Sequence, residues 1–132
     1  MEAKADAALG KTPLCRRVLV AEDDRALLEL LTDYLELQGL EVSAVETGEA
    51  ALQELEGDRP PDIAVLDIRM PGIWGSDVLR RIKREPRFSR IKVAVITGLG
   101  PDEFELETRP DEFLAKPVDV DSLRAALARM CN

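Results

Sequence analysis

Short apolar runs alternate along the chain with longer stretches in which apolar residues recur every three or four positions. The run Val18–Ala21 is apolar at four successive positions, which is typical of a strand buried on both faces of a parallel sheet. Runs of this kind, one of them with alternating polarity, predict five strands, at Val18–Ala21, Glu41–Val45, Ile63–Leu66, Ile91–Ile96 and Phe113–Ala115. Because parallel neighbours need crossover connections, the alternation predicts an α/β fold, with a parallel sheet between layers of helices.

Helical stretches lie between the predicted strands, and several begin beside a residue that can cap a helix. Asp24, Thr47 and Asp119 carry side-chain oxygens that can accept hydrogen bonds from the free N–H groups of a first turn. The residues expected on the inner faces share helical spacing: Leu27, Leu31, Tyr34, Leu35 and Gln38; Ala51, Leu52 and Leu55; Val78, Leu79 and Ile82; and Val120, Leu123, Leu127 and Met130.

Two stretches break the pattern. Residues 1–15 show no sustained period and are interpreted as a flexible N-terminal tail before a folded domain at 16–132. Between Gly98 and Asp111 the chain holds two prolines and a run of acidic residues, with Phe104 and Leu106 as its apolar positions. Such a segment cannot form a long amphipathic helix, so the fourth helix is expected to be short or irregular.

Composition and charge narrow the class of protein. The chain has 132 residues, of which 45% are hydrophobic and 33% charged, as in an ordinary single globular domain. No apolar run approaches the roughly 20 residues of a membrane-spanning helix, and no secretory signal begins the chain, so a cytoplasmic protein without a membrane partner is expected. The net charge of 18 − 26 = −8 argues against direct nucleic-acid binding. A basic cluster around Pro86 is interpreted as a solvated helix face.

Histidine is absent, which excludes Ser-His and Cys-His nucleophile pairs and histidine-based zinc sites. The two cysteines, Cys15 and Cys131, lie near opposite ends of the sequence. A disulfide scaffold is not expected in a chain with this much core, and both are interpreted as reduced, structurally incidental thiols.

The candidate chemistry follows the strands directly. Ligand crevices in open parallel sheets lie beyond the carboxyl ends of the strands, so Glu22, Asp23, Asp67, Thr97 and Lys116 are expected to converge there. Oxygen donors without His or Cys suit a hard cation, and an incomplete protein shell favours Mg²⁺ over Ca²⁺. With the metal bound, Asp67 could attack phosphorus and form an acyl phosphate. Lys116 would offset charge on the phosphoryl group, and Thr97 would donate its hydroxyl to it.

Four strings, VLVAEDD, AVLDIRMPG, VAVITG and FLAKPV, resemble the motifs of the response-regulator receiver domains of two-component signalling, including the chemotaxis-type single-domain receivers. They occur in the family's order and cover essentially all of residues 16–131. The resemblance implies a flavodoxin-like doubly wound sheet of order 2-1-3-4-5 with helices on both faces. It also implies a sensor histidine kinase or phosphotransfer protein as phosphodonor and a downstream effector protein or domain as output partner. A receiver of this kind catalyses only its own phosphorylation and dephosphorylation, and binds no organic cofactor.

The resemblance also implies a role for each matching residue. Asp67 becomes the phosphoacceptor, Asp23 binds Mg²⁺ directly and Glu22 binds it through water. The remaining roles are a backbone carbonyl on the Mg²⁺ from Arg69, phosphate contacts from Thr97 and Lys116, and a switch pair formed by Thr97 and Phe113. An aromatic residue on a strand can equally be a core residue, so both readings of Phe113 stay open.

Two other functions compete with the receiver interpretation. One is a phosphorylation-independent interaction module that keeps the same fold. The other is an aspartyl-phosphate hydrolase, which is disfavoured because Arg69 stands where a second acid would be needed. Bulky residues two positions past Asp67 and Thr97, namely Arg69 and Leu99, are expected to hinder a hydrolytic water and prolong the life of the phosphoryl group.

Overall fold

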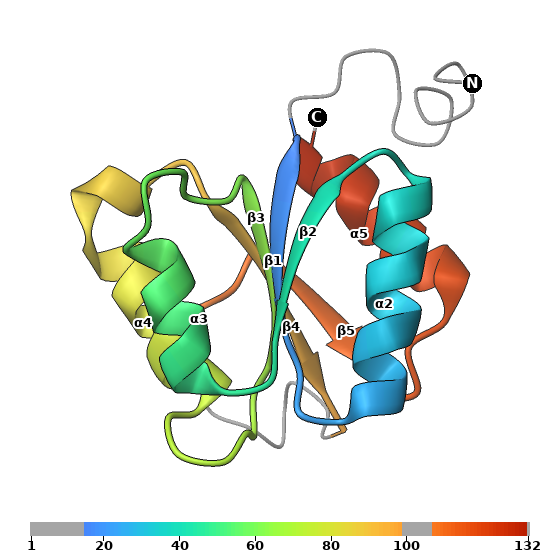
Figure 1. Cartoon of the computed structure of the whole chain (residues 1–132), viewed down its shortest axis with the longest axis horizontal. Helices are drawn as coiled ribbons and strands as arrows, with labels where there is room; N and C mark the ends of the chain where they lie inside the picture. Colours follow the sequence, from blue (N-terminus) through green and yellow to red (C-terminus); the bar gives the residue numbers. More distant parts are fainter. Residues whose placement is uncertain (1–14, 99–106, 132) are drawn as a thin grey trace.

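A computed structural model of the chain describes residues 15–98 and 107–131. Five strands form one sheet with helices on both faces (Figure 1). The strands are β1 (Arg17–Ala21), β2 (Glu41–Val45), β3 (Ile63–Asp67), β4 (Lys92–Thr97) and β5 (Glu112–Ala115). The helices are α2 (Arg25–Leu37), α3 (Gly48–Leu55), α4 (Gly75–Arg84) and α5 (Val120–Cys131), with a 3₁₀ turn η1 at Pro86–Phe88. In this part of the chain no helix is long and apolar enough to cross a membrane.

The strand order is β2-β1-β3-β4-β5, and every neighbouring pair is parallel, which confirms the predicted topology. The register aligns the carboxyl ends of the central strands. Ala21 lies opposite Leu66, Asp67 opposite Ile96, and Thr97 opposite Ala115. Whatever follows these strands in the sequence therefore meets at one edge of the sheet.

Each face of the sheet has its own apolar core, because successive side chains of a strand point to opposite faces. Val18, Val20, Ile63 and Val65 face α2 and α5. Leu19, Ala21, Ala64 and Leu66, from the same two strands, face α3 and α4. The two layers of helices are visible on either side of the sheet in Figure 1. This two-faced burial explains why the strands are apolar at successive positions.

The predicted caps are present. Asp24 Oδ1 accepts hydrogen bonds from the backbone N–H groups of Ala26 and Leu27 at 3.0 and 3.3 Å. Thr47 Oγ1 accepts from the N–H of Ala50 at 3.1 Å, and Asp119 Oδ1 accepts from that of Ser122 at 2.7 Å. Each satisfies an N–H group that has no partner within the first turn of a helix.

Two details of the helical faces differ from the prediction. The buried stripe of α2 is Leu28, Leu31 and Leu35, while Leu27 is only partly buried. The sequence Leu27-Leu28-Glu29-Leu30-Leu31 offers two adjacent apolar stripes, and packing against the sheet selects the second. In α5, Val120 is 49% exposed, because the first turn extends beyond the edge of the core.

The segment between β4 and β5 lies mostly outside the described residues, which stop at 98 and resume at 107. Its described part, 107–111, contains no helix. The expected tail also lies outside them, except for Cys15, which the sequence analysis assigned to the tail. Cys15 is 4% exposed and is part of the core between the sheet and α5.

The expectation of two reduced thiols is wrong. Cys15 and Cys131 form a disulfide, with 5.4 Å between their Cα atoms and 116 positions between them in sequence. Cys15 directly precedes β1, and Cys131 is the last residue of α5. Helix α5 packs on one face of the sheet and runs antiparallel to the strands. Its last turn therefore lies beside the start of β1 (Figure 1). The separation of the two cysteines in sequence therefore does not predict their separation in the folded protein.

Candidate functional site

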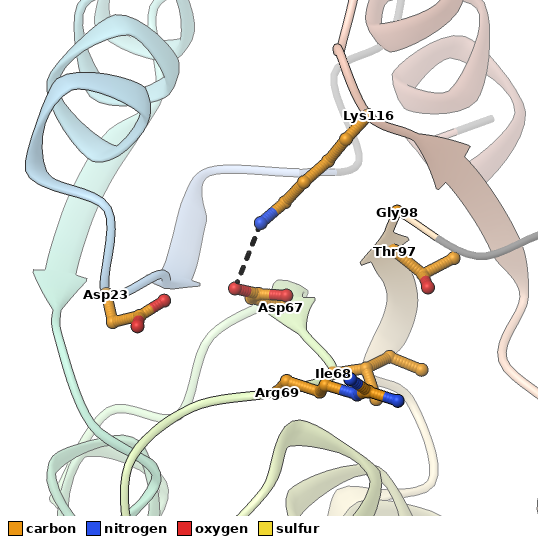
Figure 2. Close-up of a pocket in the computed structure, with 7 residues that line it drawn as sticks. All are labelled: Asp23, Asp67, Ile68, Arg69, Thr97, Gly98 and Lys116. Atoms are coloured by element: carbon orange, nitrogen blue, oxygen red, sulfur yellow. Dashed lines mark hydrogen bonds and ion pairs between the residues drawn. The ribbon is translucent and has the colours of Figure 1, made fainter.

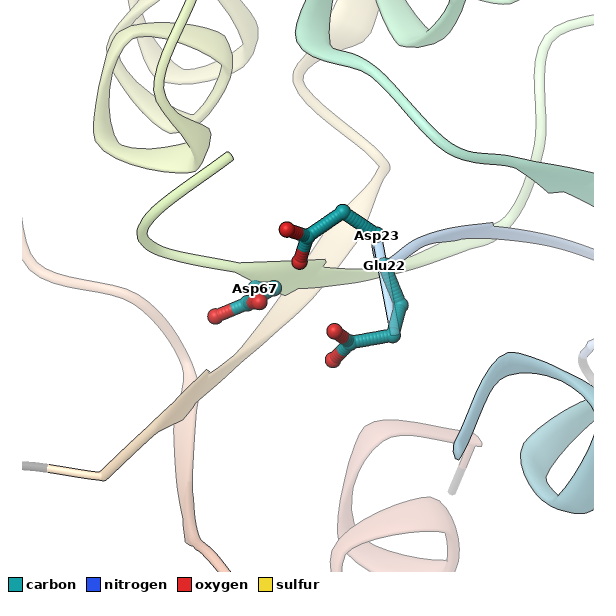
Figure 3. Close-up of side chains that lie close together, drawn as sticks. All are labelled: Glu22, Asp23 and Asp67. Atoms are coloured by element: carbon teal, nitrogen blue, oxygen red, sulfur yellow. The ribbon is translucent and has the colours of Figure 1, made fainter. Parts of the chain in front are cut away.

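Three carboxylates gather where β1 and β3 end. Glu22 and Asp23 directly follow β1, and Asp67 is the last residue of β3. Each offers an oxygen that lies within 4.8 Å of the others, and Figure 3 shows the three side chains beside one another. Glu22 is fully buried and Asp67 is 4% exposed, whereas Asp23 is open to solvent. Burial disfavours the charged form of an acid, and a neighbouring carboxylate adds to this effect.

Glu22 shows the effect directly. Burial, reinforced by the neighbouring carboxyl of Asp67, raises the pKa of Glu22 to about 7, against the lowering effects of the Asp24 backbone N–H and of Lys116. The Asp24 N–H donates to Glu22 Oε2 at 3.0 Å. The other oxygen, Oε1, is buried and has no hydrogen-bond partner among the described residues. A buried acceptor without a partner is costly, so this oxygen marks a place where a cation or a bound proton belongs.

Lys116 is the cation nearest the cluster. Its Nζ donates to Asp67 Oδ2 at 3.2 Å and lies 3.6 Å from Glu22 Oε1. Burial acts to lower the pKa of Lys116, but the charges of Asp67 and Glu22 outweigh it and hold that pKa above its ordinary value. The ammonium group therefore stays charged at neutral pH. It faces Asp67, as Figure 2 shows, and lies close to Glu22 as well.

An open pocket of about 440 Å³ adjoins the cluster. Asp23, Asp67 and Lys116 line it together with Ile68, Arg69, Thr97 and Gly98, which are drawn in Figure 2. Thr97, the last residue of β4, is 6% exposed and brings a hydroxyl to the pocket wall. A Cβ built on Gly98 would meet no atom within 4 Å, so the pocket is open beside it. The pocket thus combines acids, one ammonium, one hydroxyl and room for a small anionic group.

Backbone hydrogen bonds hold these side chains in place. The N–H of Glu22 donates to Val45 O at 3.1 Å, and that of Lys116 donates to Thr97 O at 3.0 Å. The N–H of Ile68 donates to Ile96 O at 3.1 Å. The ladders of the sheet thereby continue one residue beyond the strands. Groups positioned by a rigid sheet edge lose little freedom when a ligand binds.

Two glycines that the sequence analysis did not single out shape the connection between β3 and α4. A Cβ on Gly75 would collide with the backbone carbonyl of Asp67, and a Cβ on Gly48 would collide with that of Ile73. The N–H of Gly75 also donates to Ile68 O at 2.8 Å. The start of α4 therefore packs directly on the backbone of the candidate nucleophile. The sequence signal was a glycine at the first position of each helix, which is weak evidence alone.

Two cation–π contacts flank the site. The guanidinium of Arg69 lies 5.7 Å from the ring centroid of Trp74, which is 41% exposed. The guanidinium of Arg109 lies 5.6 Å from that of Phe113 on β5. Phe113 is partly buried and packs against the core under α3 and α4. Its ring thus has a packing role, while one face meets a charged side chain near the surface.

The structure brings Glu22, Asp23, Asp67, Thr97 and Lys116 together at one edge, as their positions after the strands predict. Arg69 lines the same pocket, with its side chain turned over Trp74. Leu99, proposed to affect the hydrolytic water, lies outside the described residues. The three close carboxylates, including the buried Glu22 oxygen that accepts no hydrogen bond from the described residues, form a donor set that suits a hard divalent cation.

Residues 18–128 match the family described as "Response regulator receiver domain". The phosphate regulon transcriptional regulatory protein PhoB of Rhizobium meliloti is 32% identical over 117 residues, covering 86% of this chain and 51% of that protein. The response regulator PleD of Caulobacter vibrioides is 39% identical over 106 residues, covering 78% of this chain and 23% of that protein. The chain therefore spans about half, or less, of the length of these curated relatives.

Solved structures agree with this match. The signal receiver domain of a signal transduction histidine kinase from Syntrophus aciditrophicus superposes with a TM-score of 0.80 at 29% identity, covering 88% of this chain and 89% of that one. The response regulator protein TrrA from Thermotoga maritima, solved in complex with Mg(2+)-BeF, gives 0.77 at 28% identity, covering 87% and 98%.

Proposed function

The chain belongs to the response regulator receiver domains of two-component signalling, and from this membership we propose that Asp67 accepts a phosphoryl group in a reaction that requires Mg²⁺. The observation that carries the proposal is the pairing of a buried carboxylate with an ammonium inside an acidic cluster. Lys116 Nζ lies 3.2 Å from Asp67 Oδ2, at the mouth of a pocket that can admit a phosphoryl group.

Asp67 acts as the nucleophile. A carboxylate oxygen attacks phosphorus, the new P–O bond makes an acyl phosphate, and the bond from phosphorus to the donor's leaving group breaks. The leaving group departs from the open side of the pocket, opposite the sheet. Because α4 packs on the backbone of Asp67 through Gly75, the backbone that carries the nucleophile is fixed before the reaction. Little conformational freedom is then lost when the donor binds.

Glu22, Asp23 and Asp67 would hold the cation, with the backbone carbonyl of Arg69 as a further oxygen donor. Asp23 is exposed and suited to direct binding, whereas the buried Glu22 is suited to binding through water. Bound Mg²⁺ supplies positive charge that offsets the acids and the oxygens of the phosphoryl group. The TrrA relative was solved with Mg(2+)-BeF, which supports a divalent cation in this fold.

Lys116 and Thr97 act on the phosphoryl oxygens. The ammonium of Lys116 already faces Asp67 and can move its hydrogen bond to a phosphoryl oxygen as the product forms. Thr97 donates its hydroxyl from the neighbouring strand and thereby couples the modification to β4 and β5. Phe113 of β5 lies opposite Val95 of β4. It changes its packing when Thr97 moves, and so carries the switch to the surface.

The phosphodonor is a sensor histidine kinase or a phosphotransfer protein, and the output passes to an effector protein or domain. Both partners place the chain in the cytoplasm. The family match is to a receiver domain. As a receiver, the domain would catalyse only its own phosphorylation and dephosphorylation.

The test is incubation with acetyl phosphate and MgCl₂, followed by intact mass measurement. We expect the wild type to gain the mass of one phosphoryl group and the Asp67→Asn variant to gain none. Asp58→Asn, an exposed carboxylate in the α3–β3 connection, is the matched control and should gain the group like the wild type. Trp74, the single tryptophan, lies 41% exposed near the pocket and reports Mg²⁺ binding by fluorescence.

Other outcomes separate the alternatives. Suppose that Trp74 fluorescence reports tight Mg²⁺ binding, but that neither acetyl phosphate nor a phosphorylated phosphotransfer protein places a phosphoryl group on Asp67. This result would favour the phosphorylation-independent interaction module. A phosphoryl group on the Asp67→Asn variant would place the acceptor elsewhere. If the wild type gained a stable phosphoryl group in EDTA, the reaction would not require a metal ion.

A further inference from the structure

The Cys15–Cys131 disulfide lies far from the pocket. Cys15 precedes β1, whereas Glu22 and Asp23 follow the carboxyl end of the same strand. Glu22 lies seven positions beyond Cys15, which is about 23 Å of extended chain at the usual rise of a strand. The disulfide therefore joins the sheet to the last turn of α5 at the edge opposite the acidic cluster. Figure 1 shows the start of β1 and the end of α5 side by side at that edge.

We propose that the Cys15–Cys131 disulfide is a thiol-reducible clasp, which makes the hold of α5 on the sheet respond to the redox state of the surroundings. The clasp gives the domain a second chemical input, independent of the phosphoryl group on Asp67.

The domain does not need this bond as a scaffold. Both faces of the sheet have a closed apolar core, formed by the helices and strands of residues 15–98 and 107–131. Disulfides act as scaffolds in small secreted domains that cannot build such a core. In the reducing compartment proposed above, a disulfide that persists or forms at intervals is typically a redox-sensing one.

Reduction leaves a folded domain with a looser α5. Cys131 is fully buried and Cys15 is 4% exposed, and both belong to the core beneath α2 and α5. Reduced thiols pack as small apolar groups, so the core survives without the bond. Other contacts still hold the helix, including the two hydrogen bonds from Arg129 to Glu112 on β5 at 2.9 and 2.8 Å. What is lost is the covalent link between β1 and the last turn of the helix.

The reductant is a cellular dithiol. One of its thiolates attacks a sulfur of the disulfide, and a mixed disulfide forms as the Cys15–Cys131 bond breaks. The second thiol of the dithiol then displaces the protein sulfur, and the dithiol leaves as a disulfide. Two electrons pass to the protein, and the two protons of the dithiol finish on Cys15 and Cys131. Because both sulfurs are buried, the attack requires local opening of the last turn of α5.

The first measurement counts thiols in protein denatured without reductant, before and after treatment with an excess of a reduced dithiol such as thioredoxin. We expect none before and two after. Thermal unfolding of the two forms should then differ. The bond closes a loop with a separation of 116 residues, and its loss lowers the melting midpoint by roughly 10 °C.

The matched control is the double variant Cys15→Ala, Cys131→Ala. Its melting midpoint should match that of the reduced wild type and should not change when the dithiol is added. The wild-type comparison needs no variant, so it remains decisive if the double variant folds poorly. Hydrogen exchange should localise the change. On reduction, the amides in the last turn of α5 should exchange faster, and the exchange rates in β3 should not change.

Three results would overturn the proposal. Two free thiols in the untreated denatured protein would show that the bond does not form. Equal melting midpoints for the oxidised and reduced forms would show that the disulfide does not strengthen the hold of α5 on the sheet. A native protein that stays oxidised for hours in excess dithiol would show a permanent staple instead of a responsive one. None of these measurements uses a phosphodonor, so they stand apart from any failure of phosphorylation at Asp67.

Discussion

Replacing Glu22 with Gln should remove a pH-dependent weakness of the metal-free domain. Glu22 is fully buried, and its pKa in the folded protein is raised from 4.5 to about 7, chiefly by burial. The folded state therefore binds this proton more tightly than the unfolded state does. Stability is greatest below the unfolded pKa, falls as the pH rises from about 4.5, and levels off above about 7. Glutamine keeps the shape of the side chain and has no proton to lose.

The size of the effect follows from the two pKa values. A difference of 7 − 4.5 = 2.5 units, at about 1.4 kcal/mol per unit, corresponds to roughly 3 kcal/mol between pH 4.5 and pH 8. Other acids contribute at lower pH. The pKa of Asp111, for example, is held below its ordinary value by Lys83 and the Val93 N–H despite partial burial, so its contribution to stability is lost only below about pH 4. Comparing variant with wild type isolates the Glu22 contribution.

The assay is urea unfolding in EDTA at pH 5 and pH 8. The wild type should lose about 2.5 kcal/mol more of its unfolding free energy between these values than Glu22→Gln does. Glu54→Gln, an exposed residue of α3, is the control and should follow the wild type. Mg²⁺ should offset the loss in the wild type at pH 8, because the cation binds the ionised carboxylate of Glu22 in the folded state and not in the unfolded one. Parallel pH profiles for wild type and Glu22→Gln would refute the reasoning.

Three further substitutions test the geometry of the pocket. Gly75→Ala should cost about 2 kcal/mol in urea unfolding and slow phosphorylation by acetyl phosphate, because its Cβ collides with the Asp67 carbonyl; wild-type rates would contradict this. Gly98→Ala places a Cβ in open space and should stabilise the domain by about 0.5 kcal/mol through the unfolded state, so a loss of stability would show that the position needs glycine. Arg69→Ala removes an exposed cation at the pocket mouth and should speed decay of the phosphoprotein in Mg²⁺ several-fold, measured by intact mass; unchanged decay would exclude a role in screening water.

The parts of the fold that depend on local pattern could be predicted from the sequence. Strands such as Val18–Ala21 are apolar on both faces because helices cover both, and this pattern is readable without coordinates. The place of the site could also be predicted, because the strands are parallel. A parallel register forces residues that directly follow the strands, such as Glu22, Asp67 and Lys116, to one edge.

Features that depend on how elements pack could not be predicted. The disulfide requires the end of α5 to meet the start of β1, a distance set by the packing of the helix on the sheet. The choice of Leu28 over Leu27 depends on the same packing, because both lie at helical spacing. The contact of Gly75 with the Asp67 carbonyl involves only backbone approach, to which the sequence offers no specific signal.

The separation of the two cores has a consequence for how such a domain can change over evolutionary time. The layer of α3 and α4 carries the contacts that set the position of the Asp67 backbone, while the layer of α2 and α5 carries the disulfide. Substitutions in one layer reach the other only through the sheet, whose strands are rigid. Lifetime of the phosphoryl group and sensitivity to thiols can therefore be adjusted separately, by mutations that accumulate on opposite sides of the same five strands.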